Sequence, residues 1–202
     1  MIKIAIFASG RGSNFNAIAK AVKSGLIKAR LALLVCDNPE ALVIRKAERM
    51  GIKVALVQRK DFTSKKDFET RIIAHLKAQD IGLIVLAGFM RILSARFVGK
   101  YKNRIINIHP SVLPSFKGTE VIRDAYDYGI KITGVTVHFV DQEMDHGPII
   151  LQAPVMIDES DTLVSLEEKI HKQEHKLYPE AIKLFIEGRL KIKGRKVKIL
   201  TR

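Results

Sequence analysis

An asparagine and a histidine stand two residues apart in the run INIHP, residues 106–110. The run is typical of a strand that Pro110 ends, and side chains two residues apart on a strand point to the same face. Asn107 and His109 therefore project together at a strand end, where ligands bind in open α/β sheets. An amide donor beside an imidazole can stabilise a developing oxyanion. The alternative is a strand end with a hydrogen-bonded histidine of purely structural role.

A carboxylate follows in the run MDHGP, residues 144–148. Its glycine and proline predict a loop between two strands, from which Asp145 can reach His109. A carboxylate at that position would stabilise the protonated imidazole and fix its orientation. We therefore predict a catalytic centre made of Asn107, His109 and Asp145.

A glycine-rich turn, GRGSN at residues 10–14, lies between the first predicted strand and the first predicted helix. Such a turn lets the backbone approach an anion, which the helix N-terminus also favours, so it predicts a phosphate site. A complete dinucleotide-binding fingerprint needs a small residue where Phe15 stands, so the match is incomplete. Asp37, at the end of the second predicted strand, is the only feature that still allows a nicotinamide cofactor. The alternative is a tight turn in which Ser13 or Asn14 caps a helix.

The run HKQEH, residues 171–175, matches the inverted zincin pattern H-x-x-E-H. A catalytic zinc site needs a third protein ligand, and only Glu180 and Glu187 follow, both on the same predicted helix. We therefore expect no metal, and expect Glu174 either to lie on a polar surface or to bind a hydroxyl-rich ligand.

Short apolar runs alternate with amphipathic stretches over the first hundred residues, which is the βαβα pattern of a parallel sheet covered by helices. Strands are predicted at 2–8, 31–36, 53–57 and 81–87. A first helix is predicted from residue 13 to about 24. A second ends before Gly51 and has Val43, Ala47 and Met50 on one face. A third begins after Ser64 and buries Phe68, Ile72 and Leu76.

The second half departs from this repeat. Strands at 104–108, 132–140 and 149–157 are separated by loops rich in proline and glycine, and 160–188 is a helix that Pro179 should kink or restart. The predicted class is α/β, a Rossmann-like open, mostly parallel sheet with helices on both faces and mixed or antiparallel strands in the C-terminal half. We expect one domain over 1–202, with a phosphate-binding half (1–100), a catalytic half (101–188) and a basic ribbon (189–202).

The charge is concentrated at the C-terminus. The net charge is +14, and the final run RLKIKGRKVKILTR holds seven of the positive charges and no acid. Its alternation around Gly194 predicts a two-stranded ribbon with a solvated cationic face, and without interleaved aromatic residues it does not indicate a nucleic-acid surface. No apolar run reaches the roughly 18 residues of a membrane span, and Cys36 has no disulfide partner. A cytoplasmic protein is expected, without nucleic-acid or membrane partners.

Together these motifs resemble the phosphoribosylglycinamide formyltransferase family, a branch of the folate-dependent formyl-hydrolase family. The resemblance runs from Ile2 to about Leu190 and rests on five runs in the family's order and spacing: ASGRGSNFNAI, VLAGFMRIL, NIHPSVLPSFKG, GVTVHFVDQEMDHGPIILQ and QEHKLYP. It implies transfer of the formyl group of 10-formyltetrahydrofolate to the amine of glycinamide ribonucleotide in purine biosynthesis, without a metal. Relatives with an additional N- or C-terminal domain are longer than this chain.

Roles for individual residues are carried over from the resemblance. It implies that Gly12, Ser13 and Asn14 hold the substrate phosphate and that Glu174 binds its ribose or glycinamide part. The folate pocket would be lined by Met90, Arg91, Ile92 and Leu93, with the loop from Val140 through Asp141 to Asp145 around the pterin. Lys65 stands where the family often has an arginine that contacts folate, and lysine keeps the charge but not the planar fork.

Other readings stay open at this point. Residues 90–93 could be ordinary core with one surface arginine. A nicotinamide dehydrogenase and a non-catalytic anion-binding module remain alternative functions, and the oligomer could be a monomer or a homodimer.

Overall fold

The computed structural model describes residues 1–201, which form two compact units. The first unit is Met1–Ile106, and the second begins at Asn107. Residue 202, the last of the predicted ribbon, lies outside the described residues.

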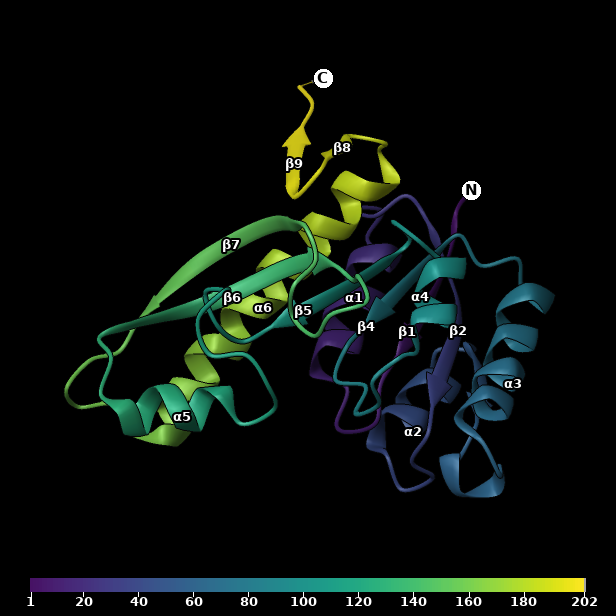
Figure 1. Cartoon of the computed structure of the whole chain (residues 1–202), viewed down its shortest axis with the longest axis horizontal. Coiled ribbons are helices and arrows are strands. Elements are labelled where there is room, and N and C mark those ends of the chain that lie inside the picture. Colours follow the sequence, from purple (N-terminus) through teal and green to yellow (C-terminus); the bar gives the residue numbers. More distant parts are fainter. Residues whose placement is uncertain (202) are drawn as a thin grey trace. The chain divides into compact units, whose positions relative to one another are not determined.

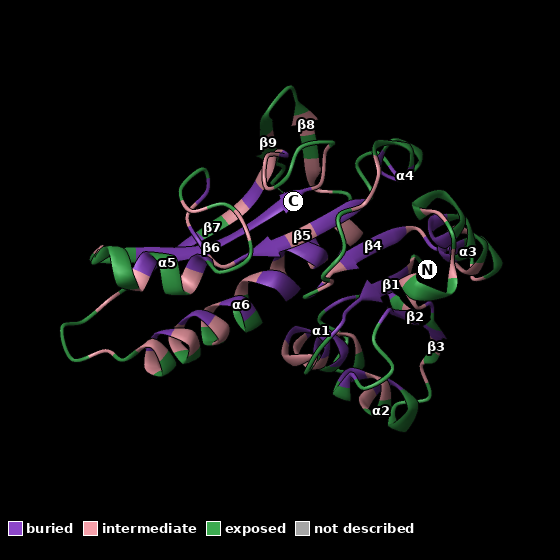
Figure 2. Ribbon diagram, turned by 60° about the horizontal axis from the view of Figure 1, so that its bottom comes forward, coloured by how far each residue is buried: buried purple, intermediate pink, exposed green. Residues whose placement is uncertain are grey.

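The first unit is a parallel α/β structure (Figure 1). Four strands pair in parallel in the order β3-β2-β1-β4: β1 (Lys3–Phe7), β2 (Arg30–Cys36), β3 (Lys53–Leu56) and β4 (Leu83–Leu86). The helical elements are α1 (Ser13–Lys23), α2 (Leu42–Arg49), the 3₁₀ helix η1 (Arg59–Asp61), α3 (Lys65–Ala78) and α4 (Ala95–Lys100). Figure 2 shows α1 and α2 on one side of these strands and α3 on the other, as right-handed crossovers require when the strand order reverses.

Local sequence explains where α3 begins and which face it buries. The Ser64 side chain accepts a hydrogen bond from the backbone N–H of Asp67, which caps the helix. Phe68, Ile72 and Leu76 are buried at i, i+4 and i+8, as the periodicity predicts. On α2, Val43 and Ala47 are buried in the same way.

The second unit holds β5 (Ile105–His109), whose first two residues belong to the first unit, and four further strands in the order β5-β6-β7-β9-β8. The antiparallel pairs are β6 (Ile132–Phe139) with β7 (Ile149–Met156), and β8 (Leu190–Lys193) with β9 (Lys196–Ile199). Helix α5 (Val121–Tyr128) packs on α6 (Leu163–Ile186), which covers β6 and β7 (Figure 1). The α/β class, the parallel first half, the antiparallel strands of the second half and the C-terminal ribbon are confirmed.

Three predictions about local structure were wrong. Met50 is 48% exposed because α2 ends at Arg49, so the predicted buried stripe stops at Ala47. Helix α6 does not restart at Pro179 but runs through it as one 24-residue helix. The region predicted as a loop between the strands at 104–108 and 132–140 contains α5, which is too short for sequence periodicity to reveal and which is stabilised by packing.

No helix within residues 1–201 combines the length and the apolar character that crossing a membrane requires.

Candidate active site

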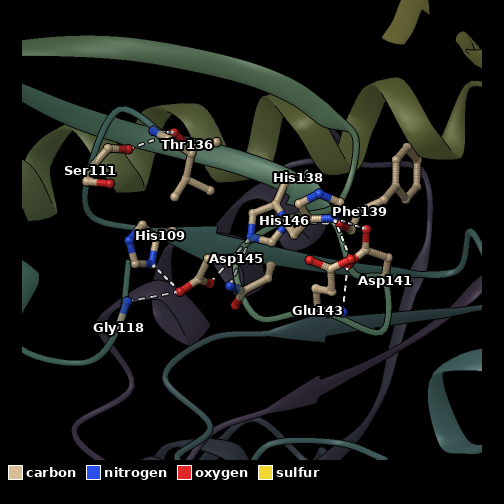
Figure 3. A network of polar contacts seen from close by, with 12 residues as sticks. His109, Ser111, Gly118, Thr136, His138, Phe139, Asp141, Glu143, Asp145 and His146 are labelled. Carbon is tan, nitrogen blue, oxygen red and sulfur yellow. Dashed lines mark hydrogen bonds and ion pairs between the residues drawn. The ribbon is translucent and has the colours of Figure 1, made fainter. Parts of the chain in front are cut away.

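His109 and Asp145 face each other inside the second unit (Figure 3). His109 is the last residue of β5, and its Nδ1 lies 3.4 Å from Oδ2 of Asp145. On the other side of the ring, Nε2 lies 2.8 Å from the carbonyl oxygen of Phe116, which can only accept a hydrogen bond. The His109 and Asp145 side chains are 4% and 10% exposed. A protonated His109 ring therefore has an acceptor at each nitrogen, away from bulk water.

The loop from Val140 to Pro148 holds Asp145 in place. Asp145 has a φ of 50°, in the left-handed region that aspartate and asparagine tolerate better than most residues. A Cβ on Gly147 would lie 1.8 Å from the carbonyl oxygen of Phe139, so only glycine allows this close approach. The backbone N–H of Phe139 donates to the carbonyl of Pro148 across the base of the loop. Strained, tightly closed backbone of this kind is typical of functional sites.

A second histidine, His138, lies between Asn107 and Asp145. Its Nδ1 lies 2.8 Å from the carbonyl oxygen of its neighbour Phe139, so Nδ1 carries the proton. The free electron pair of Nε2 then accepts from the side-chain nitrogen of Asn107, 3.2 Å away. Oδ1 of Asp145 lies 3.8 Å from the same Nε2. The pKa of His138 lies below its ordinary value, because burial lowers it by more than the Phe139 carbonyl and the Asp145 carboxylate raise it.

The sequence analysis missed His138, although the sequence contains a signal for it. Thr136 and His138 are two residues apart on β6, the spacing of Asn107 and His109 on the neighbouring strand β5. A second pair of polar side chains at period two on a buried strand indicates a polar face there.

Thr136 holds the segment that follows β5. Its hydroxyl donates to the carbonyl of Ser111 (2.6 Å) and accepts from the backbone N–H of Leu113 (3.0 Å). Farther along, Phe116 presents its carbonyl to His109, and the backbone N–H of Gly118 donates to Oδ2 of Asp145 (3.3 Å). These main-chain contacts could not be read from sequence because they depend on the path of an irregular segment.

The glycine-rich turn lies in the first unit, between β1 and α1. Gly12 has a φ of 70°, and a Cβ there would lie 2.8 Å from Cβ of Val43 on α2. The carbonyls of Gly10 and Arg11 accept from the backbone N–H of Val43 and the ammonium of Lys46. Gly12 occupies the cap position of α1 without a side-chain cap hydrogen bond, so the alternative in which Ser13 or Asn14 caps the helix was wrong.

The segment Met90–Leu93 lies in the first unit and exposes apolar side chains. Met90 and Ile92 are 68% and 70% exposed, so the reading of this segment as ordinary core was wrong. Its ends are held in place. The backbone N–H of Met90 donates to the hydroxyl of Ser9 (3.1 Å), and the backbone N–H of Ser94 donates to the buried carboxylate of Glu69 (2.6 Å). A fixed segment with exposed apolar side chains is suited to an apolar ligand.

Asp37 is committed to internal contacts. Its Oδ1 accepts from the hydroxyl of Ser9 (2.5 Å), its Oδ2 lies 2.6 Å from Nε of Arg91, and its side chain is 4% exposed. Because both oxygens are engaged and shielded, Asp37 is poorly placed to bind the ribose of a nicotinamide cofactor. A pocket of about 420 Å³ adjoins this network; it is lined by Ser9, Asp37, Asn38, Pro39, Gln58, Arg59, Lys60, Met90 and Arg91.

The remaining predicted site residues are placed as follows. Lys65 is exposed at the first residue of α3, and Glu174 is buried on α6, where its carboxylate adds to burial in raising the pKa of Tyr178. Val140 and Asp141 begin the loop that carries Asp145.

The HKQEH run lies on α6, with Glu174 buried and His175 exposed. Among residues 1–201, no three His, Cys, Asp or Glu side chains are grouped as a metal ion would require.

A parallel α/β unit with a glycine turn is followed by a unit where an amide, two imidazoles and a carboxylate meet, an arrangement that can stabilise an oxyanion in group transfer. The chain belongs to the formyl transferase family, whose model matches residues 2–182. It is 48% identical to the phosphoribosylglycinamide formyltransferase of Bacillus subtilis (strain 168) over 91% of this chain and 94% of that protein.

Two further comparisons agree with this family. A crystal structure of glycinamide ribonucleotide transformylase 1 from Symbiobacterium toebii has a TM-score of 0.97 and 42% identity, over 100% of this chain and 95% of that one. The trifunctional purine biosynthetic protein adenosine-3 of Gallus gallus is 38% identical over 95% of this chain, which spans 19% of that protein.

Proposed function

We propose that this chain transfers the formyl group of 10-formyltetrahydrofolate to the amine of glycinamide ribonucleotide, giving formylglycinamide ribonucleotide and tetrahydrofolate. The observation that carries the proposal is the buried pair of His109 and Asp145 beside Asn107, on a chain similar over most of its length to phosphoribosylglycinamide formyltransferases.

The chemistry requires stabilisation of a negatively charged oxygen. The amine nitrogen of the ribonucleotide attacks the formyl carbon, and the former carbonyl oxygen becomes an oxyanion in a tetrahedral intermediate. The side-chain amide of Asn107 has two hydrogens, of which His138 accepts one, so the second can reach the oxyanion. Nε2 of His109 is the other donor. In the reaction, the oxyanion replaces the Phe116 carbonyl as the acceptor of the Nε2 hydrogen.

Collapse of the intermediate requires a proton to move. The bond from the formyl carbon to N10 of the folate breaks, the proton that the attacking amine loses is delivered to N10, and tetrahydrofolate leaves. Asp145 orients the His109 ring, because its carboxylate lies against Nδ1. It also assists the proton transfer between the two nitrogens.

The substrates are bound by the residues that the resemblance implies. The turn of Gly12, Ser13 and Asn14 holds the phosphate at the N-terminus of α1, where the helix dipole favours an anion. Glu174 binds the ribose or the glycinamide part.

The folate is held by apolar and charged contacts. It lies against the segment Met90–Leu93, with Lys65 near its carboxylates and with Val140 and Asp141 at the start of the loop around the pterin. The exposed side chains of Met90 and Ile92 support this assignment. The protein works in the cytoplasm on small-molecule substrates.

The test is the reaction itself: the purified chain is incubated with 10-formyltetrahydrofolate and glycinamide ribonucleotide, and tetrahydrofolate formation is followed. We expect turnover that requires both substrates. Binding of phosphate compounds without turnover would instead indicate an anion-binding module, and saturable nicotinamide binding would indicate a dehydrogenase.

A further inference from the structure

The C-terminal hairpin, β8 and β9, has no role in the reaction described above. Its register pairs Leu190 with Ile199 and Ile192 with Val197, which places apolar side chains on one face. At its base, Nε of Arg189 donates to the carbonyl of Leu200 (2.8 Å). The hairpin is therefore a defined element, with Gly194 and Arg195 as its two-residue turn.

The hairpin is anchored beside the loop that carries Asp145. Lys196, directly after the turn, pairs in parallel with Ile149, the first residue of β7. Ile149 follows Gly147 and Pro148, which close that loop. The turn of the hairpin thus lies where the loop ends, and both belong to the second unit.

Arg195 binds the loop directly. Its Nη2 donates to the carbonyl oxygen of His146 (2.7 Å), and its Nη1 lies 2.6 Å from Nε2 and 3.1 Å from Nδ1 of the same residue. Nδ1 of His146 lies 2.8 Å from Oδ2 of Asp141. With the proton on Nδ1, the ring donates to Asp141, and Nη1 of Arg195, which is close to both ring nitrogens, lies against the imidazole. One guanidinium thereby fixes the backbone and the side chain of the residue next to Asp145.

The loop carries several negative charges, which a nearby cation stabilises. Its run DQEMD, residues 141–145, carries three carboxylates within five residues. Asp141 and Glu143 both approach His146, at 2.8 Å and 3.9 Å from Nδ1. Carboxylates gathered this closely repel one another, and a cation beside them reduces that repulsion. Arg195 brings a charge that does not depend on pH, with a planar fork suited to two acceptors.

We propose that the C-terminal hairpin is a positioning element of the active site, in which Arg195 holds the Asp141–Asp145 loop so that Asp145 stays against His109. Arg195 does not touch the reacting atoms. It acts through His146 on the loop that the proposed function places around the pterin, and this inference rests on that function.

The test compares two charge losses on the same hairpin. Arg195→Ala removes the contact to His146, whereas Lys193→Ala removes one exposed positive charge to which the structure assigns no hydrogen bond or ion pair within residues 1–201. We expect Arg195→Ala to lower kcat for formyl transfer about tenfold, because a small displacement of a catalytic group is costly. The kcat of Lys193→Ala should be within about twofold of that of the unaltered chain. Equal rates for the two variants would overturn the proposal.

A second measurement does not depend on catalysis. Hydrogen exchange of the backbone amide of Glu143, which donates to Oδ1 of Asp141 (3.0 Å), reports the order of the loop. Its exchange should become at least tenfold faster in Arg195→Ala and stay unchanged in Lys193→Ala. Arg195→Lys, which keeps the charge but loses the fork, should recover only part of the protection. Unchanged protection in Arg195→Ala would overturn the positioning role even in a chain that does not transfer formyl groups.

Discussion

Nε2 of His138 accepts a hydrogen bond from the side-chain nitrogen of Asn107 at 3.2 Å, and this contact sets which way the Asn107 amide points. The donor and acceptor roles follow from the other ring nitrogen, because Nδ1 of His138 faces the carbonyl of Phe139. A neutral His138 can accept in this way, whereas a protonated ring cannot. Burial favours the neutral ring by lowering its pKa, so we expect the buried histidine to orient the side-chain amide of Asn107.

Replacing His138 by phenylalanine removes the acceptor and keeps a ring in the same space. Asn107 is then free to turn, so we predict that His138→Phe lowers kcat about tenfold with little change in either KM. His138→Gln places a carbonyl oxygen near the same position and should recover part of the rate. Steady-state kinetics with both substrates decide the matter, and a kcat for His138→Phe equal to that of the unaltered chain would show that the contact does not orient Asn107 for catalysis.

The depressed pKa of His138 also predicts how stability depends on pH. Below the unfolded pKa of about 6.5, the unfolded chain binds a proton at this residue that the folded chain does not, so the free energy of unfolding falls as pH decreases. Urea unfolding of His138→Phe between pH 7 and pH 5 should show a smaller decrease than the unaltered chain shows.

His75 is the control for that experiment. Burial lowers its pKa as well, followed by the charges of Arg71 and Lys53, but it lies on the partly exposed face of α3. His75→Gln should keep most of the pH dependence. If His75→Gln and not His138→Phe flattened the curve, the assignment to His138 would be wrong.

Sequence patterns predicted the regular elements of the fold and missed the short ones. The stripe of Phe68, Ile72 and Leu76 spans more than two turns, and Ser64 signals its start, so α3 was predictable. Helix α5 buries only Val121 and Ala125 and depends on its packing against α6, which no local pattern encodes. The sequence predicted a restart of the helix at Pro179, because a proline normally disrupts a helix interior. Helix α6 continues through Pro179, which is buried there.

In the candidate site too, residues on regular strands could be predicted and groups on irregular segments could not. Asn107 and His109 were predictable because strand alternation alone places them on one face. The approach of Asp145 to His109 was predicted from its place in a loop between two strands, and its Oδ2 lies 3.4 Å from Nδ1 of His109. The Phe116 carbonyl and the Gly118 N–H are main-chain groups of an irregular segment, and side-chain types carry no signal for them.

The catalytic assignments are tested by removing each donor. Asn107→Ala or His109→Ala should lower kcat about a hundredfold or more while both substrates still bind, because each deletes one donor to the oxyanion. Asp145→Asn keeps the shape of the side chain and removes its charge, so kcat should also fall. Isothermal titration checks binding and steady-state assays check turnover. Near-normal turnover in the Asn107 and His109 variants would leave these side chains with a structural role only.

The glycine turn should discriminate between the two substrates. Ser13→Ala removes one donor at the start of α1, and Gly12→Val adds strain at a φ of 70° and a clash with Val43. Both changes should raise the KM for glycinamide ribonucleotide far more than that for the folate. Ser13→Ala is the decisive variant because it introduces no clash. An equal rise of both KM values in a folded Ser13→Ala protein would contradict the phosphate assignment.

Asp37 should affect the folate side alone. Its carboxylate binds Nε of Arg91 at 2.6 Å and the hydroxyl of Ser9 at 2.5 Å, and that hydroxyl in turn accepts from the backbone N–H of Met90. Asp37→Asn keeps the size of the side chain but weakens the charge-assisted hydrogen bond, which loosens the start of the Met90–Leu93 segment. We therefore predict a rise of about tenfold in the KM for 10-formyltetrahydrofolate, with the KM for glycinamide ribonucleotide and kcat nearly unchanged. Lys60→Ala, which removes an exposed charge from the same pocket, is the matched control and should have a smaller effect. Parallel rises in both KM values for Asp37→Asn would mean that Asp37 supports the whole unit rather than the folate segment.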